Sequence, residues 1–392
     1  MHKKVDIVYV VASEIGSIGM GTTSYNAVRG IEKNGSFSFN VFCRGHDSSK
    51  ANLKKENLKS YGFLEYISYP FRFLEKTIKI KINYFKHINK LFGDLVSKNL
   101  PKCKIYHTWM GLAPEAVLKA KRQGAILVLE GANSHPLKSL EICNKEYSKF
   151  NKKEFMTEPI KLRKEIELIQ KFDYVMCPSD FVYDSFLKNG FSKKQLIKMP
   201  YGVDIERFKP NKKEKDKKFK AIFIGSLQLR KGLQYLLKAW NELKLENAEL
   251  IIVGRVWPDA HEVINKYRKD STIKFIGFDS NPSKYLRSSD VFISPSLEEG
   301  SALTCYEALA SGVPLIATHN TGSVIRDGKE GFIIPTRDVT ALKDKINYFY
   351  SNPEETKRMG KNARKLAEKY SWDGYGERLA KVYKKILIEN GK

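Results

Sequence analysis

Two glutamates, eight positions apart, bracket the segment of this chain with the clearest potential for chemistry. Glu299 lies in a predicted loop, and Glu307 lies inside a short predicted helix. The first N–H groups of a helix are unpaired and carry partial positive charge, so a helix start attracts anions. We therefore expect a phosphate on the amides that lead into this helix, with a carboxylate on either side to accept hydroxyl hydrogen bonds. These amides belong to Gly300, Ser301, Ala302 and Leu303.

A phosphate between two acceptors of sugar hydroxyls is the arrangement that a nucleotide-sugar requires. A second interpretation stays open, because strand–loop–helix packing units with solvated glutamates are common. The surrounding pattern predicts the same elements in either case. Val291–Ile293 predicts a buried strand before the loop, Leu303–Ala310 predicts the helix, and Leu315–Thr318 predicts the next strand.

A second segment of interest, Gly225–Gly232, carries basic side chains between a predicted strand, Phe219–Ile224, and a predicted helix, Leu233–Leu243. Arg230 and Lys231 suit a diphosphate, because charged donors next to a helix start favour phosphate oxygens. We expect the side chain of Arg230 to point off the loop toward solvent.

Near the N-terminus, a glycine-containing loop joins a predicted strand, Val5–Val11, to a predicted helix, Tyr25–Lys33. This order is typical of a Rossmann-like unit. The glycine spacing is not the dinucleotide fingerprint, so the loop is either a tight turn or a contact to phosphate or sugar.

Strand and helix alternate twice along the chain, which predicts two doubly wound α/β domains that face each other across a cleft. His135 follows the predicted strand Ala125–Leu129, at the sheet edge where such folds place ligands. It is either a site residue or a loop histidine without a special role. Ser179 follows the strand Tyr174–Cys177 and is either a site residue or a helix cap.

The 392 residues are enough for two domains, and 42% of them are hydrophobic. No apolar run reaches the length of a membrane-spanning helix, and the N-terminus is better interpreted as a first strand than as a signal peptide. The five cysteines are scattered without a disulfide or zinc pattern, which favours a reducing cytoplasm.

The formal net charge is +25, which favours polyanionic partners such as nucleic acid, anionic lipid or phosphorylated substrates. The stretch Phe71–Lys90 interleaves lysines with aromatic residues at helical spacing. Such a helix either lies on an anionic membrane surface or presents a solvated lysine face over a core helix.

The segment around the two glutamates resembles the E-x7-E signature of the family 4 retaining glycosyltransferases, which have the GT-B fold. The matching residues are Pro295, Glu299, Gly300, Glu307, Ala308, Ser311, Gly312, Pro314, Gly328 and Gly331. Pro200–Pro210 resembles the interdomain element of this family, and the end of the chain resembles its closing helix, which crosses back onto the first domain.

The resemblance implies a role for each candidate residue. Glu307 would accept hydrogen bonds from the ribose hydroxyls and Glu299 from the donor sugar. Lys231 and Arg230, with the amides after Glu299, would stabilise the departing diphosphate, and His135 would lie near the sugar or phosphate.

The resemblance also implies roles for residues at the edges of the same site. In the family, the segment Gly225–Gly232 has an arginine where Ser226 stands, so the holder of the second phosphate charge is open. The backbone of Phe278 would contact the base, and Gly19 and Gly21 would face the cleft.

The predicted function is a retaining glycosyltransferase that moves a sugar from a UDP- or GDP-linked donor to a hydroxyl acceptor, such as a lipid-linked or surface-glycan intermediate. No D-x-D motif occurs in the sequence, so we expect no metal and no other cofactor. The alternatives are a GT-B nucleotide-sugar epimerase and a basic nucleic-acid-binding protein, although no nucleic-acid motif is present.

The predicted domains are residues 1–200, completed by the closing helix 374–392, and residues 201–373 for the donor. The expected location is the cytoplasm, with peripheral attachment to the inner face of the membrane as a further expectation.

Overall fold

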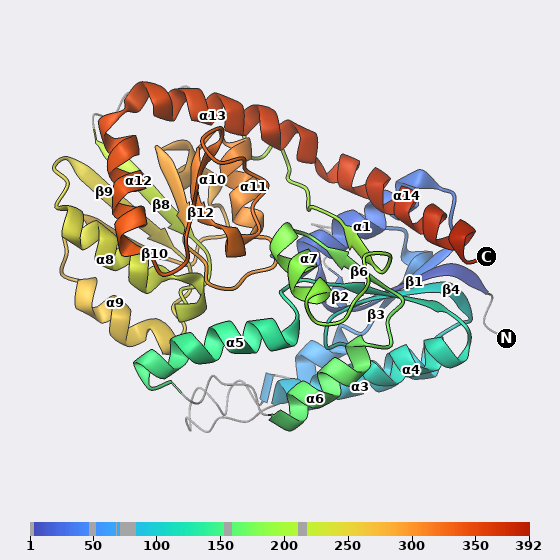
Figure 1. The fold of residues 1–392 in the computed structure, drawn as a ribbon. Helices are drawn as coiled ribbons and strands as arrows, with labels where there is room; N and C mark the ends of the chain where they lie inside the picture. The colour runs from blue at the N-terminus through green and yellow to red at the C-terminus, as the bar shows by residue number, and fades with distance from the viewer. Residues whose placement is uncertain (1–3, 47–51, 68, 71–83, 153–158, 211–217) are drawn as a thin grey trace.

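The structure is a computed structural model that describes residues 4–46, 52–67, 69–70, 84–152, 159–210 and 218–392. Its two parallel β-sheets each have helices on both faces (Figure 1). This is the doubly wound architecture that the alternation of strands and helices predicted. The boundaries proposed for the two domains stay a prediction.

Within the described residues, the first sheet has seven strands in the order β3-β2-β1-β4-β5-β6-β7. Their bounds are β1 Val5–Ile15, β2 Phe39–His46, β3 Leu58–Ser60, β4 Cys103–Trp109, β5 Ile126–Glu130, β6 Tyr174–Cys177 and β7 Leu196–Lys198. The order reverses between β1 and β4, so the loops after these two strands flank the switch point of the first sheet.

In the same described part, the second sheet has six strands in the order β10-β9-β8-β11-β12-β13. Their bounds are β8 Phe219–Ile224, β9 Ala248–Val253, β10 Ile273–Gly277, β11 Val291–Ser294, β12 Leu315–Thr318 and β13 Gly331–Ile334. Its order reverses between β8 and β11, the two strands whose following loops carry most of the predicted site residues. A ligand is therefore expected at this edge on topological grounds as well.

Within the described residues, the helices of the first half include α1 Met20–Asn34, α3 Tyr84–Asn99, α4 Pro114–Arg122, α5 Pro136–Tyr147, α6 Pro159–Ile169 and α7 Asp180–Leu187. Those of the second half are α8 Leu233–Leu243, α9 His261–Tyr267, α10 Ser283–Arg287, α11 Leu303–Ala310, α12 Val339–Ser351, α13 Pro353–Ala367 and α14 Trp372–Glu389. A short 3₁₀ helix, η4 Leu229–Lys231, precedes α8.

Helix α14 crosses from the second half of the chain back to the first sheet, as expected from the resemblance, and packs along α1 (Figure 1). The helices approach closely because Gly30 and Gly376 face each other: a Cβ on Gly30 would lie 2.3 Å from the Cα of Gly376. The tyrosine hydroxyl of Tyr383 lies 2.5 Å from Nδ1 of His107 on β4. Helix α14 is therefore part of the first domain's core.

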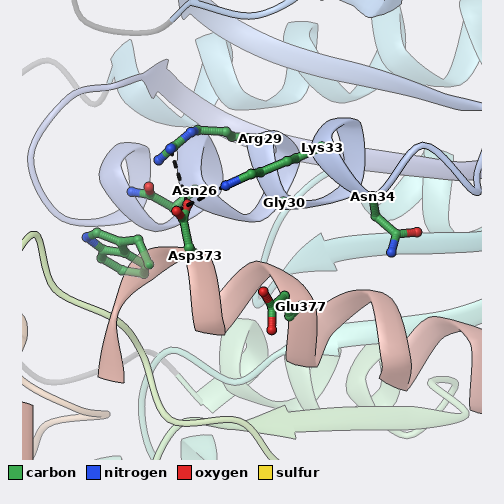
Figure 2. Close-up of a pocket in the computed structure, with 8 residues that line it drawn as sticks. Asn26, Arg29, Gly30, Lys33, Asn34, Asp373 and Glu377 are labelled. Carbon is green, nitrogen blue, oxygen red and sulfur yellow. Dashed lines mark hydrogen bonds and ion pairs between the residues drawn. The ribbon is translucent and has the colours of Figure 1, made fainter. Parts of the chain in front are cut away.

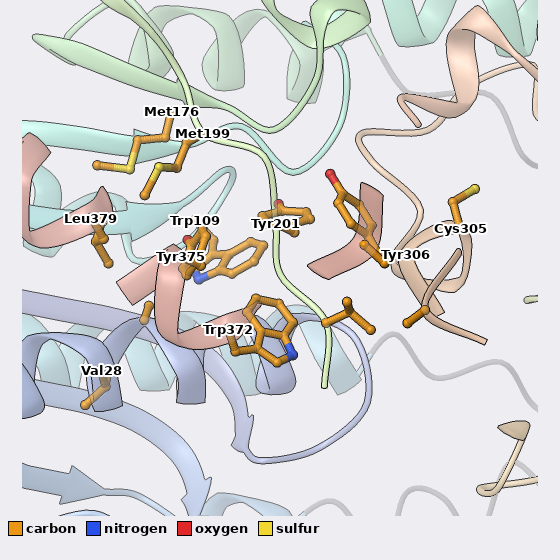
Figure 3. Close-up of a cluster of buried hydrophobic side chains, with 14 of the residues drawn as sticks. Val28, Trp109, Met176, Met199, Tyr201, Cys305, Tyr306, Trp372, Tyr375 and Leu379 are labelled. Carbon is orange, nitrogen blue, oxygen red and sulfur yellow. The ribbon is translucent and has the colours of Figure 1, made fainter. Parts of the chain in front are cut away.

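A continuous apolar seam joins the two halves of the chain. Trp109, Tyr201, Tyr306, Trp372 and Tyr375 are all buried in it (Figure 3). They come from β4, from the segment that leads into the second half, from α11 and from α14, so the seam connects the core of each sheet to the elements that cross between them.

Two predicted elements differ from the structure. Helix α1 begins at Met20, inside the predicted loop, and Gly21 lies in its first turn. The short edge strand β3 has no counterpart among the predicted elements. Residues 71–83 of the basic stretch lie outside the described residues, and the rest of that stretch belongs to α3.

Candidate functional site

The predicted site residues Glu299 and Lys231 come together at the switch point of the second sheet. Nζ of Lys231 contacts the Oε2 atom of Glu299, and each side chain is only 13% exposed. Burial lowers the pKa of Lys231 well below that of a free lysine, the charge of Arg230 lowers it further, and the carboxylate of Glu298 opposes this shift. The pair links η4 to the β11 loop, by which we mean Pro295–Ala302.

Arg230 lies over the same loop, and the expectation that its side chain points off toward solvent is wrong. Its Nη1 atom donates to the carbonyl of Glu298 at 3.0 Å and lies 3.4 Å from Oε2 of Glu298 and 3.7 Å from Oε2 of Glu299. The backbone of η4 is equally engaged, since Leu297 N donates to the carbonyl of Arg230 at 2.8 Å. Two cations and two carboxylates therefore form one compact cluster.

Glu298 connects this cluster to the first domain, and sequence reasoning gave it no role. Its carboxylate is buried, and Oε1 accepts hydrogen bonds from N and Oγ of Ser134 at 3.2 and 2.9 Å. Ser134 belongs to the loop that follows β5. The available sequence signal was a second acidic residue directly beside Glu299.

Gly300 lies where the loops of the two domains touch. A Cβ on Gly300 would lie 1.6 Å from the carbonyl oxygen of Ala132, so only glycine fits here. The carbonyl of Gly300 accepts a hydrogen bond from Oγ of Ser179 at 2.5 Å, and Ser179 also caps α7. The residue that was expected to present an amide to phosphate is thus also an interdomain contact.

The start of α11 corrects one of the expected amide donors. The N–H of Ala302 donates to the carbonyl of Thr321 at 3.3 Å, so it is already used. Helix α11 begins at Leu303, whose N–H has no partner within the helix because of its position in the first turn. Ser301 is buried, and its hydroxyl donates to the carbonyl of Gly322 at 2.8 Å.

Glu307 lies one turn further along α11, half-buried. Burial raises the pKa of its carboxyl to about 7, and the positive charge of Arg207 opposes this rise. Near neutral pH this carboxyl is partly ionised, and its ionised form accepts hydrogen bonds. Arg207 also donates to the carbonyl of Ser280 at 2.9 Å, so it ties the loop after β10 to the neighbourhood of Glu307.

Three predicted residues lie at the neighbouring strand ends of the second sheet. Gly225 and half-buried Ser226 directly follow β8. Phe278 follows β10 and is 59% exposed, and the guanidinium of Arg255 lies 5.9 Å from its ring centroid. All three residues thus lie at the carboxyl edge that also holds the β11 loop.

The two N-terminal glycines differ in what their backbones require. Gly19 has φ 76° as the residue before α1, and a Cβ there would meet nothing within 4 Å. Gly21 lies in the helix, where a Cβ would come 2.3 Å from the carbonyl oxygen of Glu14. Both glycines have a local structural reason, and their expected contact to a ligand stays a prediction.

His135 lies inside the first domain. It is the residue before α5, its Nδ1 accepts from the N–H of Leu137 at 3.3 Å, and its ring packs edge-on against Phe186 and Phe191. Burial lowers the pKa of His135 to about 4, so the ring is neutral at physiological pH. These contacts give the histidine a capping and packing role, and its expected contact to sugar or phosphate stays a prediction.

A pocket of about 340 Å³ lies elsewhere, between α1 and the start of α14 (Figure 2). The carboxylate of Asp373 pairs there with Arg29 and Lys33, each at 3.1 Å, and none of the predicted site residues lines it. Among the residues that the structure describes, no helix has both the length and the apolar character to span a bilayer.

The chain is similar in sequence to one protein family and to several curated proteins. Residues 204–366, which contain the second sheet and the loops after β8 and β11, match the family model "Glycosyl transferases group 1". This part of the chain is therefore similar to group 1 glycosyl transferases. A curated relative, the MMP alpha-(1->4)-mannosyltransferase of Mycolicibacterium hassiacum, is 29% identical over 206 residues, 50% of this chain and 50% of that protein. The chain spans about half the length of the curated relatives that it matches.

Solved structures resemble the chain over nearly its whole length. Sucrose-phosphate synthase from Thermosynechococcus elongatus has a TM-score of 0.71 at 17% identity, covering 98% of this chain and 99% of that one. HepE from Anabaena, solved with UDP and glucose, has a TM-score of 0.68 at 16% identity, covering 98% of this chain and 100% of that one. The fold is therefore GT-B, with two Rossmann-like domains, as the resemblance implied.

Proposed function

We propose that this protein is a retaining glycosyltransferase that moves a sugar from a nucleoside diphosphate to a hydroxyl group of an acceptor. The bond between the anomeric carbon and the diphosphate breaks, a bond from the acceptor oxygen forms on the same face, and the acceptor hydroxyl loses its proton. Negative charge grows on the diphosphate during this step, so positive groups held in place at that position lower the barrier.

The observation that carries the proposal is the joint placement of Lys231, Glu299 and the start of α11 at the switch point of the second sheet. Cations and first-turn amides there suit the diphosphate, with Arg230 and Lys231 as the cations and the amides between Gly300 and Leu303, apart from the paired one of Ala302, as donors. Glu299 would accept from the sugar hydroxyls.

Glu307 would accept hydrogen bonds from the ribose hydroxyls. Its half-buried carboxyl lies about one helical turn beyond the first amide of α11, so the ribose would lie next to the diphosphate. Gly225 and Ser226 would follow the diphosphate, and the backbone of Phe278 would contact the base. His135 and the loop with Gly19 and Gly21 would border the sugar from the first domain. No step in this scheme requires a metal.

The donor is proposed to be UDP- or GDP-linked. HepE is described in complex with UDP and with glucose, which supports a UDP-sugar. The M. hassiacum relative is named a mannosyltransferase, and another relative is named as a capsular polysaccharide biosynthesis glycosyltransferase. These names support a sugar acceptor within a surface glycan.

The membrane part of the proposal rests on the sequence. The basic and aromatic stretch Phe71–Lys90 would attach the enzyme to the anionic inner face of the membrane, next to a lipid-linked acceptor. In the described part of this stretch, Lys86 and Lys90 on α3 are exposed.

A donor panel tests the function. Each UDP- and GDP-sugar is added in turn, and the true donor must raise the melting temperature by mass action and release its nucleoside diphosphate when an acceptor is present. Conversion of the donor to an isomer without acceptor would instead identify an epimerase. Salt-dependent binding to random DNA with no response to any nucleotide-sugar would favour the nucleic-acid-binding alternative.

A further inference from the structure

The basic side chains of the segment Gly225–Gly232 are already paired with carboxylates, so they supply no net positive charge for a diphosphate. Arg230 lies at ion-pair distance from the carboxylates of Glu298 and Glu299, and Lys231 pairs with that of Glu299. Two cations and two carboxylates give this cluster no net positive charge, whereas each phosphate of a sugar-linked diphosphate carries a negative charge. A further cation at this edge of the sheet would therefore contribute directly to binding.

Arg255 lies at this edge, at the end of β9, beside the segment that follows β8. The pairing of β8 with β9 continues past the strands, since Gly225 N donates to the carbonyl of Val253 at 3.0 Å and Leu227 N to the carbonyl of Arg255 at 2.9 Å. This register places Ser226 opposite Arg255. Paired strands are about 4.8 Å apart, so the two residues are close neighbours.

The guanidinium of Arg255 is available for a ligand. The residue is exposed, and within the described residues no carboxylate lies at ion-pair distance from it. Its side chain lies over the ring of Phe278, itself exposed at the end of β10. A cation over an aromatic ring at an exposed site is held weakly, so it can turn toward a stronger partner such as a phosphate oxygen.

We propose that Arg255 is a donor-binding residue that hydrogen-bonds the diphosphate from the β9 side, between the loop at Ser226 and the loop at Phe278. The inference rests on the proposed function and deepens it, because it names the positive charge that the cluster around Glu298 and Glu299 does not supply.

The test is Arg255→Ala, with Arg268→Ala as the matched control. The guanidinium of Arg268 also lies 5.9 Å from a ring centroid, that of Phe275, in the same domain. Binding of UDP and GDP is measured by calorimetry, with uridine and guanosine as probes that lack phosphate. We expect Arg255→Ala to weaken nucleoside diphosphate binding by about 10- to 100-fold, the range for a lost hydrogen bond to a charged group. Nucleoside binding and the control variant should be unchanged.

Adding Ser226→Arg to Arg255→Ala should restore part of the lost affinity, because position 226 lies opposite position 255. An equal loss for nucleoside and diphosphate would overturn the proposal, since Arg255 would then act on the base alone. Wild-type-like diphosphate binding in Arg255→Ala would also overturn it and leave the glycosyltransferase function standing. If the wild-type protein bound no nucleoside diphosphate at all, the proposed function itself would fail.

Discussion

If Glu307 binds the donor ribose, as we propose, its half-buried carboxyl should make donor binding dependent on pH. Burial raises its pKa to about 7, and only the ionised form is a charged acceptor for the ribose hydroxyls. With that pKa the carboxyl is about 90% ionised at pH 8 and about 10% ionised at pH 6. Donor affinity should therefore fall by roughly 10-fold from pH 8 to pH 6, and Glu307→Gln should bind weakly at both values with little slope.

The assay is calorimetric titration with an intact nucleotide-sugar, since the diphosphate of such a donor has no free terminal phosphate to titrate near pH 6. Glu246→Gln, on an exposed turn of the same domain, serves as the control and should keep the wild-type slope. A wild-type affinity that is flat between pH 6 and pH 8, or an unchanged slope in Glu307→Gln, would refute the ribose role of Glu307.

The same raised pKa has a consequence for stability with a defined sign. Between about pH 4.5 and pH 7 the folded protein binds a proton at Glu307 that the unfolded chain has released. The free energy of unfolding that this proton contributes is fully present below about pH 4.5 and is lost as the pH rises through 7. Glu307→Gln should consequently raise the melting temperature of the ligand-free protein more at pH 8 than at pH 5. An equal shift at both pH values would contradict this account.

Three further predictions follow from the cluster and the sequence. Lys231→Ala should lower turnover by about 10²–10³, whereas substitution of the exposed Lys238 on α8 by Ala should not. A lower melting temperature with normal turnover would make Lys231 a structural residue. Transfer should persist in excess EDTA, and complete loss that manganese restores would contradict metal-independent chemistry. The stretch Phe71–Lys90 should bind anionic vesicles in a salt-sensitive way, worth about 1 kcal/mol per engaged basic side chain, and Lys86→Glu with Lys90→Glu should weaken it; equal binding of the wild type to neutral vesicles would count against membrane attachment.

The elements nearest the candidate site were the most predictable from sequence. Helices α8 and α11 and strand β12 have the predicted bounds, because each combines a buried apolar run with glycine or proline at its end. Strand β3 was missed, since it is a three-residue edge strand within a polar region. The start of helix α1 was predicted too far along the chain because Gly21 was taken for a loop residue. Gly21 lies within the helix, and its lack of a Cβ lets it pack against the backbone of Glu14 on β1.

The contacts between candidate residues were less predictable than the residues themselves. The pairing of Lys231 with Glu299 joins segments almost seventy positions apart, and nothing local in either segment specifies it. The same holds for Arg230, which was expected in solvent and instead faces Glu298. Residue type and spacing can indicate which groups take part in a site, whereas the ion pairs depend on how loops of different strands meet at the sheet edge.

The arrangement of Glu298 implies that the expected donor site and the meeting of the two domains are one structure. Its carboxylate accepts from Ser134 of the first domain, while its backbone carbonyl accepts from Arg230 of the second. Gly300 in the same loop touches the first domain through Ala132. A phosphate that draws Arg230 away from Glu298 would leave a buried carboxylate with fewer partners, which costs free energy unless the loop or the neighbouring domain adjusts. We therefore expect donor binding at the second sheet to be coupled, through these contacts, to the position of the first domain.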